Sequence, residues 1–268
     1  MIIFPNAKIN IGLFVERKRE DGYHDIQSIF YPVDCADVIE YEESSDFTLR
    51  IEGLKVDASM EDNLVYKSWK LLNDRFGIPA QEVRLLKSIP MGAGLGGGSA
   101  DASVLFKSLI DQYELKIAFE EQATMLATLG SDCPFFLRNE ASLVSGRGEY
   151  MTKHDLNLEG LYGLLVNPGI HSSTKEAYQG IALEPDHFDL SMLERGEIDS
   201  WKGYLKNSFE SLIFKLHPAI ESLKSSMYDQ GALYASMTGS GSSVFGIFEA
   251  LPSKNNFESY PYLRQFKF

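Results

Sequence analysis

The chain has 268 residues, 44% of them hydrophobic and 24% charged, which is typical of a soluble globular protein with one large or two modest domains. Its formal net charge of −13 and isoelectric point near 4.9 argue against nucleic-acid backbones and anionic membranes as partners. The first residues do not read as a signal peptide, and no stretch approaches the roughly 20 apolar residues of a membrane span. Cys35 and Cys133 are far apart and lack metal-like neighbours, so a reducing cytoplasm is the expected setting.

Residues 2–16 are predicted to form a strand that is interrupted near Pro5. Apolar and polar side chains alternate along it, which places Lys8 and Asn10 on the same face. A lysine on a strand is commonly a solvated edge residue, and this stretch alone leaves both readings of Lys8 open.

A charged segment then ends in the turn signal Asp21-Gly22, after which Tyr23 and His24 open a second apolar segment. A histidine in this position is more often a hydrogen-bonded surface residue than a ligand-binding one. The next predicted elements are one or two strands over residues 37–51, a helix over 63–76 and a strand over 83–89.

The segment PMGAGLGGGSADA, residues 90–102, holds five glycines within seven residues. Glycine accepts positive φ angles and lets backbone N–H groups approach a ligand closely. The apolar residues that follow have helical spacing, so the local order is strand, glycine loop and helix. Free amide donors and the helix dipole then point the same way, which predicts a binding site for a phosphate-bearing ligand.

The glycines of this loop are compatible with three other interpretations. A merely flexible loop is disfavoured because the loop separates two well-patterned elements. The glycines satisfy the dinucleotide fingerprint G-x-G-x-x-G, but a ribose-binding acid is expected about 20 residues later at the end of a strand, and Asp111 there lies in the predicted helix. A Walker loop requires Gly-Lys-Ser/Thr, and no lysine follows these glycines.

A further helix is predicted over residues 118–129, and Gly130 ends it. The sequence SDCPFFL follows, with Asp132 two residues before Pro134 and beside two phenylalanines. A carboxylate here can simply cap a turn. Aromatic neighbours also exclude water, and a partly desolvated carboxylate gains basicity, so Asp132 is a candidate general base.

The remainder of the chain alternates short strands and helices. Residues 151–159 are polar and irregular, and a domain boundary is predicted there, giving domains 1–153 and 154–268. The predicted elements are a strand over 161–167, a capping box and short helix from 173, helical pieces over 186–203, helices over 207–216 and 218–230, and strands over 233–237 and 244–248 joined by a glycine-serine loop. The tail from Pro252 is polar and aromatic, and no element is predicted in it.

With these pieces in place, the chain resembles the GHMP small-molecule kinases, and within them the members that act on a cytidine diphosphate derivative of methylerythritol. The matching stretches occur in the family's order: AKIN (7–10), DGYHDIQSIF (21–30), DNL (62–64), PMGAGLGGGSADA (90–102), GSDCPFFL (130–137) and MTGSGSSVF (237–245). The glycine loop and the last motif mark the superfamily, whereas the DGYH and PFF elements narrow the resemblance.

The resemblance implies an α+β fold of two domains with the active site in the cleft between them. The N-terminal ATP-binding domain would be of the ribosomal protein S5 domain 2-like type and the C-terminal domain ferredoxin-like. It implies catalytic roles for Lys8 and Asp132, ATP contacts at Asn63, Leu64, Pro90, Met91, Gly92, Ala93, Gly94, Leu95, Gly96, Gly97, Gly98 and Ser99, and substrate contacts at Asn10, Tyr23, His24, His171, Gly239, Ser240 and Gly241. One departure is that Ala100 stands where the family usually has a second serine.

The implied reaction is ATP-dependent phosphorylation of a hydroxyl group of the cytidine-bearing substrate, with Mg²⁺ as the metal. Phosphoryl transfer mainly needs positioning and charge stabilisation, which suits a loop of backbone amides. Asp132 would accept the hydroxyl proton and Lys8 would stabilise the developing alkoxide. The alternatives are a sister kinase for mevalonate-like or homoserine-like substrates, a nicotinamide-dependent oxidoreductase and a non-catalytic nucleotide-binding module. The expected partner is a small molecule, with no nucleic acid or membrane, and the expected state a monomer or weak homodimer.

Overall fold

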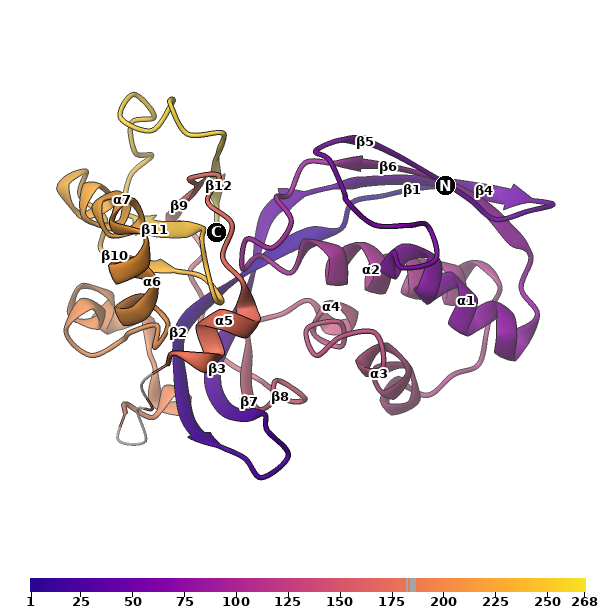
Figure 1. The fold of residues 1–268 in the computed structure, drawn as a ribbon, viewed down its shortest axis with the longest axis horizontal. Coiled ribbons are helices and arrows are strands. Elements are labelled where there is room, and N and C mark those ends of the chain that lie inside the picture. The colour runs from indigo at the N-terminus through magenta and orange to yellow at the C-terminus, as the bar shows by residue number, and fades with distance from the viewer. Residues whose placement is uncertain (182, 184–186) are drawn as a thin grey trace. The chain divides into compact units, whose positions relative to one another are not determined.

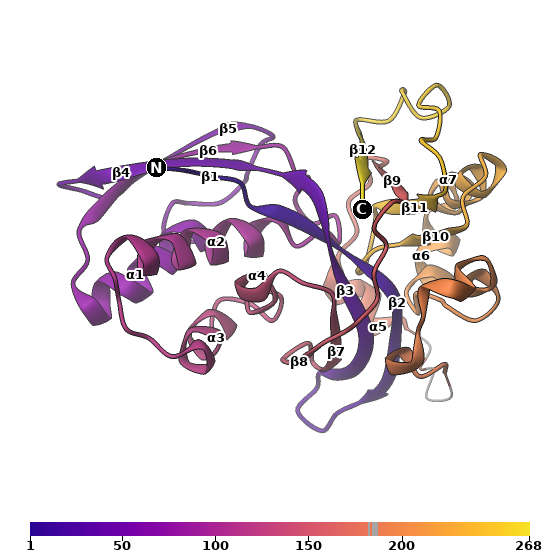
Figure 2. The same cartoon turned by 180° about the vertical axis from the view of Figure 1, so that it is seen from behind.

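The computed structural model describes residues 1–181, 183 and 187–268. The chain forms two compact units, and each is built from several separate segments. Unit 1 consists of Met1–Ala7, Cys35–Met91 and Gly96–Asn139, and unit 2 of Lys8–Asp34, Gly92–Leu95 and Glu140–Phe268. Figures 1 and 2 show the elements of both units from opposite sides.

Unit 1 contains a four-stranded sheet in the order β1-β4-β6-β5. Its strands are β1 (Ile2–Ile3), β4 (Val38–Ser44), β5 (Thr48–Gly53) and β6 (Ala80–Lys87). The central pair β4 and β6 is antiparallel, in a register that sets Val38 opposite Leu86, whereas β5 runs parallel to β6. Side chains along β6 alternate between buried and accessible, as expected of a strand with one face covered.

Helices cover one face of this sheet (Figure 1). Helices α1 (Leu64–Phe76) and α2 (Gly97–Gln112) lie next to the sheet, and α3 (Phe119–Ala127) and the short α4 (Phe135–Arg138) lie on the far side of these two helices. The apolar core between sheet and helices includes Leu72 of α1, Val83 of β6, and Leu105 and Leu109 of α2. Asn63 caps α1 by accepting a hydrogen bond from the Val65 N–H at 2.9 Å, and Gly77 ends the helix in the left-handed region.

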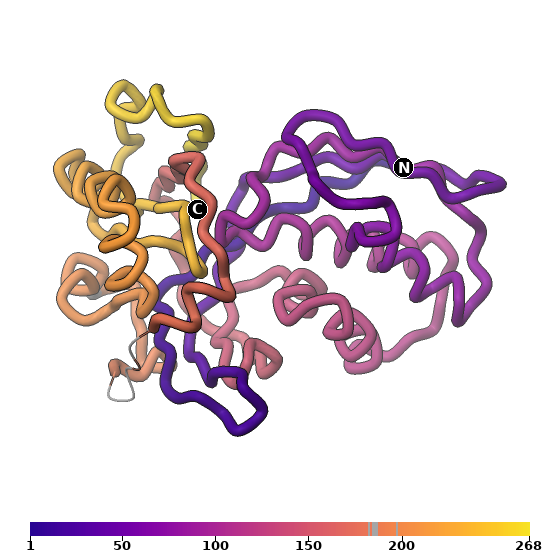
Figure 3. Tube along the Cα trace, viewed as in Figure 1, coloured from indigo at the N-terminus to yellow at the C-terminus, as the bar shows by residue number. Residues whose placement is uncertain are grey.

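Unit 2 contains two four-stranded sheets, in the orders β2-β3-β7-β8 and β10-β11-β9-β12. The strands of the first are β2 (Asn6–Lys18), β3 (His24–Ala36), β7 (Ser142–Gly146) and β8 (Tyr150–Lys153). Those of the second are β9 (Tyr162–Asn167), β10 (Tyr234–Met237), β11 (Val244–Phe248) and β12 (Tyr262–Lys267). The long strands β2 and β3 form a hairpin that can be followed in the trace of Figure 3. The unit boundaries fall within both strands, so the first residues of β2 and the last residues of β3 belong to unit 1 and the rest of both strands to unit 2.

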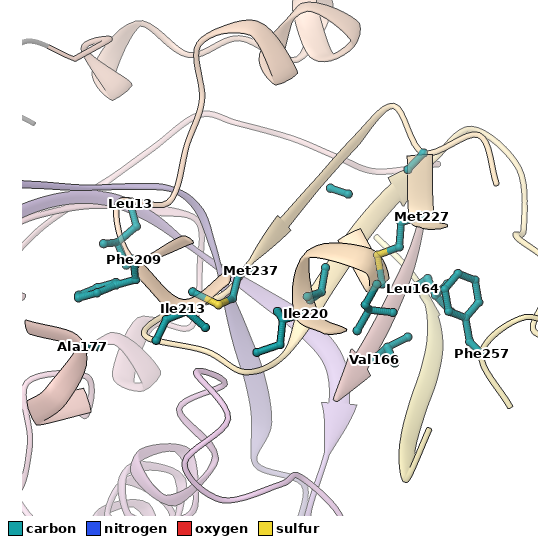
Figure 4. Close-up of a cluster of buried hydrophobic side chains, with 14 of the residues drawn as sticks. Leu13, Leu164, Val166, Ala177, Phe209, Ile213, Ile220, Met227, Met237 and Phe257 are labelled. Atoms are coloured by element: carbon teal, nitrogen blue, oxygen red, sulfur yellow. The ribbon is translucent and has the colours of Figure 1, made fainter. Parts of the chain in front are cut away.

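The helices of unit 2 are α5 (Thr174–Gln179), α6 (Glu210–Leu216) and α7 (Pro218–Asp229), with 3₁₀ turns η1 (Leu190–Met192) and η2 (Arg195–Gly203). Helix α7 places Ile220 and Met227 against Leu164 and Val166 of β9 in the unit's apolar core (Figure 4). Within the residues that the structure describes, no helix combines the length and the apolar character needed to cross a bilayer.

Most predicted elements are present, and the differences have local causes. The tail contains β12, which was not predicted, and the segment thought irregular begins with β8, the partner of β7. The helical pieces over 186–203 are 3₁₀ turns, and Asp186 itself lies outside the described residues. The predicted domains 1–153 and 154–268 are continuous, whereas the two units are not, and that division stays a prediction.

Candidate active site

The glycine loop between β6 and α2 has the backbone that its sequence predicts. Gly92, Gly94 and Gly96 all have positive φ angles, of 60°, 77° and 69°. Between them the side chains of Ala93 and Leu95 are buried and hold the loop in place, while the alternate glycines stay accessible. The loop then enters α2, whose first N–H groups have no partner inside the helix. This combination is suited to an anion.

Within unit 2, the loop lies directly against the second glycine-serine loop. A Cβ atom on Gly94 would come within 2.0 Å of the Thr238 carbonyl oxygen, so only glycine fits there. The Thr238 hydroxyl is 3.0 Å from the Gly94 carbonyl oxygen, and the Lys8 N–H donates to the Leu95 carbonyl at 3.0 Å. Three segments far apart in the sequence are therefore joined at Gly94-Leu95.

Lys8 is buried in unit 2 and is held by Asn10. Its Nζ donates to Asn10 Oδ1 at 2.7 Å and lies 4.3 Å from the centre of the Phe30 ring. Asn10 Oδ1 also accepts from the Gly239 N–H at 3.0 Å, and Asn10 Nδ2 donates to Ser28 Oγ at 2.9 Å. The alternation that places Lys8 and Asn10 on one face thus produces a fixed ammonium rather than a solvated edge residue.

The Thr238 hydroxyl completes this network. It accepts from the Asn10 N–H at 3.0 Å and lies 3.1 Å from Asn10 Oδ1. A carbonyl oxygen has two lone pairs, and those of Asn10 Oδ1 are used by Lys8 and Gly239. Since a hydroxyl has one proton, Thr238 donates it to the Gly94 carbonyl, and the hydroxyl connects the lysine network to the glycine loop.

Asp132 lies in unit 1, half-buried in the turn before α4. The turn is fixed against the start of α2, because Ser103 Oγ donates to the Cys133 carbonyl at 2.8 Å. A Cβ atom on Gly130 would come 3.5 Å from Cys133 Sγ and 3.9 Å from Ser99 Oγ. Burial raises the pKa of the Cys133 thiol, and hydrogen bonds with Ser99 and Ser103 oppose that rise. The turn of Asp132 is therefore adjacent to Ser99, the last residue of the predicted phosphate site.

The residues expected near adenine also come together in unit 1. A Cβ atom on Gly98 would lie 3.7 Å from Met91 Cε and 3.9 Å from Leu64 Cδ1. Met91 is exposed, and the Asn63 side chain accepts a hydrogen bond at the start of α1. An apolar surface thus borders the glycine loop, as the flat face of a base requires.

The predicted substrate residues of unit 2 are brought together in part. His171 lies against the glycine loop, since a Cβ atom on Gly92 would be 3.7 Å from its imidazole. His24 stacks on Tyr178 with ring centroids 5.1 Å apart, and burial lowers the pKa of His24. Tyr23 is exposed and lies under the Arg147 guanidinium at 4.9 Å.

The loop of Gly239, Ser240 and Gly241 is held by hydrogen bonds within unit 2. Asn207 Nδ2 donates to the Gly239 carbonyl at 2.8 Å, and the Gly241 N–H donates to the Thr238 carbonyl at 3.1 Å. The Ser240 carbonyl accepts from Ser172 Oγ at 2.7 Å. The loop is therefore connected to the segment that contains His171.

No dedicated metal cage was found among the described residues, where no group of three or more His, Cys, Asp or Glu side chains is placed to hold an ion. Ala100 is completely buried and its N–H bonds to the Gly96 carbonyl at 2.8 Å, so the departure from the family pattern falls on an interior face of α2.

Several functional candidates were missed by sequence reasoning. Thr238 lies within a motif that the sequence identified, but its role depends on partners at Asn10 and Gly94. Tyr178 lies on α5 and is recognised only by its stacking with His24. Lys87, the last residue of β6, and Asp37, directly before β4, are both buried charged residues. The sequence signal for this pair was a lysine at an inward-facing position of a predicted strand.

Comparison with known protein families gives matches in both halves of the chain. The family described as GHMP kinases N terminal domain matches residues 63–140, and that described as GHMP kinases C terminal matches residues 188–259. The first match contains the glycine loop and Asp132, and the second contains Thr238 and its loop.

Relatives match over nearly the whole chain. A 4-diphosphocytidyl-2-C-methyl-D-erythritol kinase of Parabacteroides distasonis is 46% identical, with 93% of this chain and 92% of the relative covered. One of Bacteroides fragilis is 42% identical, with 97% of each covered.

Two solved structures illustrate the range of similar folds. A crystal structure of 4-(cytidine 5'-diphospho)-2C-methyl-D-erythritol kinase aligns with a TM-score of 0.76 at 29% identity, covering 92% of this chain and 90% of that one. Homoserine kinase from Cytophaga hutchinsonii aligns with a TM-score of 0.59 at 19% identity, covering 91% and 85%, which shows a shared fold.

Proposed function

The chain belongs to the 4-diphosphocytidyl-2-C-methyl-D-erythritol kinase family of the GHMP kinases, and we propose that it transfers the γ-phosphate of ATP to the 2-hydroxyl of 4-diphosphocytidyl-2-C-methyl-D-erythritol. The reaction belongs to the non-mevalonate route to isoprenoid precursors. Kinase family membership favours this activity over an oxidoreductase or a non-catalytic module.

One observation carries the assignment of residues: both candidate catalytic side chains belong to segments tied to the glycine loop. In unit 2, the Lys8 N–H bonds to Leu95, and its ammonium is linked through Asn10 and Thr238 to Gly94. In unit 1, the turn of Asp132 lies beside Ser99. The pairing of Lys8 with Asp132 across the two units stays part of the proposal.

In the proposed reaction, the loop amides and the first turn of α2 bind the β- and γ-phosphates. Asp132 accepts the proton of the substrate hydroxyl as the hydroxyl oxygen attacks the γ-phosphorus, and the bond from that phosphorus to the β-phosphate oxygen breaks so that ADP leaves. Lys8 stabilises the negative charge on the attacking oxygen and the transferred group. Such general-base assistance contributes about 10²–10⁴ in rate. Mg²⁺, bound through the phosphates, supplies charge neutralisation.

Adenine is assigned to the surface of Leu64, Met91 and Gly98, which is apolar and borders the loop. Tyr23, His24 and His171 are assigned to the cytidine-bearing substrate. Supporting this, His24 and Tyr178 form an aromatic stack, and aromatic rings of this kind suit packing against a pyrimidine base. We assign the protein to the cytoplasm as a monomer or weak homodimer with a small-molecule partner and no nucleic acid.

The test is ADP release from Mg-ATP with 4-diphosphocytidyl-2-C-methyl-D-erythritol, compared with the same polyol phosphate lacking cytidine, with mevalonate and with homoserine. Activity that requires cytidine supports the proposal. Equal activity without cytidine, or activity only with mevalonate or homoserine, assigns a sister function.

Variants then test the two catalytic roles. Asp132→Asn is expected to lower kcat at saturating ATP by at least about 10²-fold, as loss of a general base predicts. Lys8→Ala is expected to lower kcat far more than it weakens ATP binding. The exposed Asp74→Asn and Lys254→Ala serve as matched controls. Near-full turnover of Asp132→Asn or of Lys8→Ala would reject the corresponding role.

A further inference from the structure

Beneath the glycine loop, unit 1 contains a buried charge cluster of Lys87, Asp37 and Asp101. Lys87 Nζ donates to Asp101 Oδ2 at 2.8 Å and also to Asp37 Oδ2. All three residues are almost completely buried, and none is part of the proposed reaction.

The cluster is attached to both ends of the loop. Asp37 lies between β3 and β4, and its Oδ1 accepts hydrogen bonds from the N–H groups of Ser88 and Ile89, directly before the loop. Asp101 is in the first turns of α2, directly after the loop. A Cβ atom on Gly97 would come within 3.0 Å of Lys87 Nζ, so the ammonium lies immediately below the helix start.

The hydrogen bonds show which carboxyl group is the better place for a proton. With both acids ionised, one cation and two anions leave the cluster with a net charge of −1. Asp37 accepts from two backbone N–H groups and Lys87, whereas Asp101 accepts only from Lys87. Among the described residues, Asp101 Oδ1 is a buried oxygen without a hydrogen-bond partner. The proton therefore belongs on Asp101.

The charges around Asp101 are consistent with this. Burial is the main cause that raises the pKa of Asp101 to about 7, the Lys87 charge opposes the rise, and Asp37 adds to it by charge and by hydrogen bonding. Lys87 comes from β6 and Asp37 from the bend before β4. The buried faces of the neighbouring helices carry no titratable side chain in the described structure; they are Val65, Ser68, Trp69 and Leu72 of α1 and Phe135, Phe136 and Leu137 of α4.

Resting on the proposed function, we propose that Asp101 is a positioning residue whose proton makes the Lys87 cluster neutral, and that binding of the nucleotide's phosphates to the loop above draws a proton onto Asp101. An ionised Asp101 leaves a buried negative charge below the site where anionic phosphates bind. A protonated Asp101 removes it, and Lys87 and the α2 dipole then act on the phosphates unopposed.

Because proton uptake is coupled to nucleotide binding, the proposal can be tested by the pH dependence of nucleotide affinity. If nucleotide binding takes up one proton, the Kd for nucleotide rises with pH above 7 by up to about tenfold per pH unit, the limit for one proton. Asp101→Asn keeps the shape of the side chain but cannot ionise, so its cluster is neutral at every pH. The variant is therefore expected to bind nucleotide more tightly than the wild type at pH 9 and equally at pH 6.5.

The experiment is calorimetric titration of the full chain with Mg-ADP between pH 6.5 and 9, in two buffers of different ionisation enthalpy, which gives Kd and protons taken up. The exposed Asp111→Asn on the same helix is the matched control. Titration of the nucleotide's own phosphate is common to all three proteins and cancels in the comparison. Proton uptake by the wild type and Asp111→Asn that is absent in Asp101→Asn supports the proposal.

Equal pH dependence in Asp101→Asn and the wild type overturns the inference, as does weaker binding of the variant at pH 9, which a purely structural role predicts. Neither outcome affects the proposed function, because nucleotide still binds. Failure of the wild type to bind Mg-ADP at any pH contradicts the proposed function itself. Far-ultraviolet circular dichroism of the variant before titration establishes that it is folded.

Discussion

Thr238→Val would remove one hydroxyl from the centre of the candidate site while it keeps the branched shape of the side chain. The hydroxyl accepts from the buried Asn10 N–H and donates to the Gly94 carbonyl. The substitution leaves the Asn10 N–H without an acceptor, and an unsatisfied buried group costs about 1–3 kcal/mol. Asn10, which holds the Lys8 ammonium, would lose its fixed position relative to the glycine loop.

The same free energy sets the size of the expected effects. If the substitution destabilises the transition state by about 1–3 kcal/mol relative to the bound substrate, kcat falls by about fivefold to 150-fold. If the substitution instead lowers the free energy of unfolding, the melting temperature falls by about 2–4 °C for each kcal/mol. The KM for ATP is expected to change less than kcat, because the loop amides remain in place.

Steady-state ADP release at saturating substrate measures the first effect, and a thermal melt measures the second. Thr238→Ser keeps the hydroxyl and is expected to stay within about threefold of the wild-type kcat, since less than 1 kcal/mol is at stake. A wild-type kcat in Thr238→Val, or equal losses in the valine and serine variants, would refute the role of the hydroxyl.

Three further outcomes follow from the same geometry. Gly94→Ala is expected to lower kcat and nucleotide affinity at least tenfold, because its Cβ would clash with the Thr238 carbonyl at a φ of 77°, whereas Gly203→Ala, with nothing within 4 Å, is expected to behave as wild type. Because folding raises the pKa of Asp101 from 3.8 to about 7, the wild type loses stability as pH rises from 4 to 7. Urea unfolding should therefore show that Asp101→Asn gains up to about 1.4 kcal/mol per pH unit relative to the wild type over that range, and parallel curves would contradict the burial argument. Tyr178→Leu should raise the KM for the cytidine substrate several-fold and leave the KM for ATP unchanged; equal changes in both would argue against its stacking role.

The sequence predicted features whose causes are local. The positive φ angles of the glycine loop follow from residue type, and the start of α1 follows from the capping chemistry of Asn63. The alternation in the first strand correctly placed Lys8 and Asn10 on one face. Such features depend on neighbours within a few residues, and those neighbours are visible in the sequence.

Features that depend on distant partners were not predictable in this way. Thr238 bonds to Asn10 across 228 positions, and Lys87 bonds to Asp37 across 50. Strand β12 exists because it pairs with β9, where the missing side chain of Gly163 leaves room for the Phe266 ring; a Cβ there would be 2.1 Å from it. Its own pattern of polar and aromatic residues is too short to indicate a strand without that partner.

The bonds between β2 and residues 206–208 have a consequence for synthesis of the chain. Leu13 in β2 bonds to Lys206 and Ser208, so this early strand stays incomplete until most of the polypeptide has left the ribosome. Most of β2 is buried in the finished protein and would be exposed during that interval. Pairings that must wait for late segments fold slowly and favour aggregation. The nascent chain is therefore most vulnerable while its first hairpin waits for its last partners.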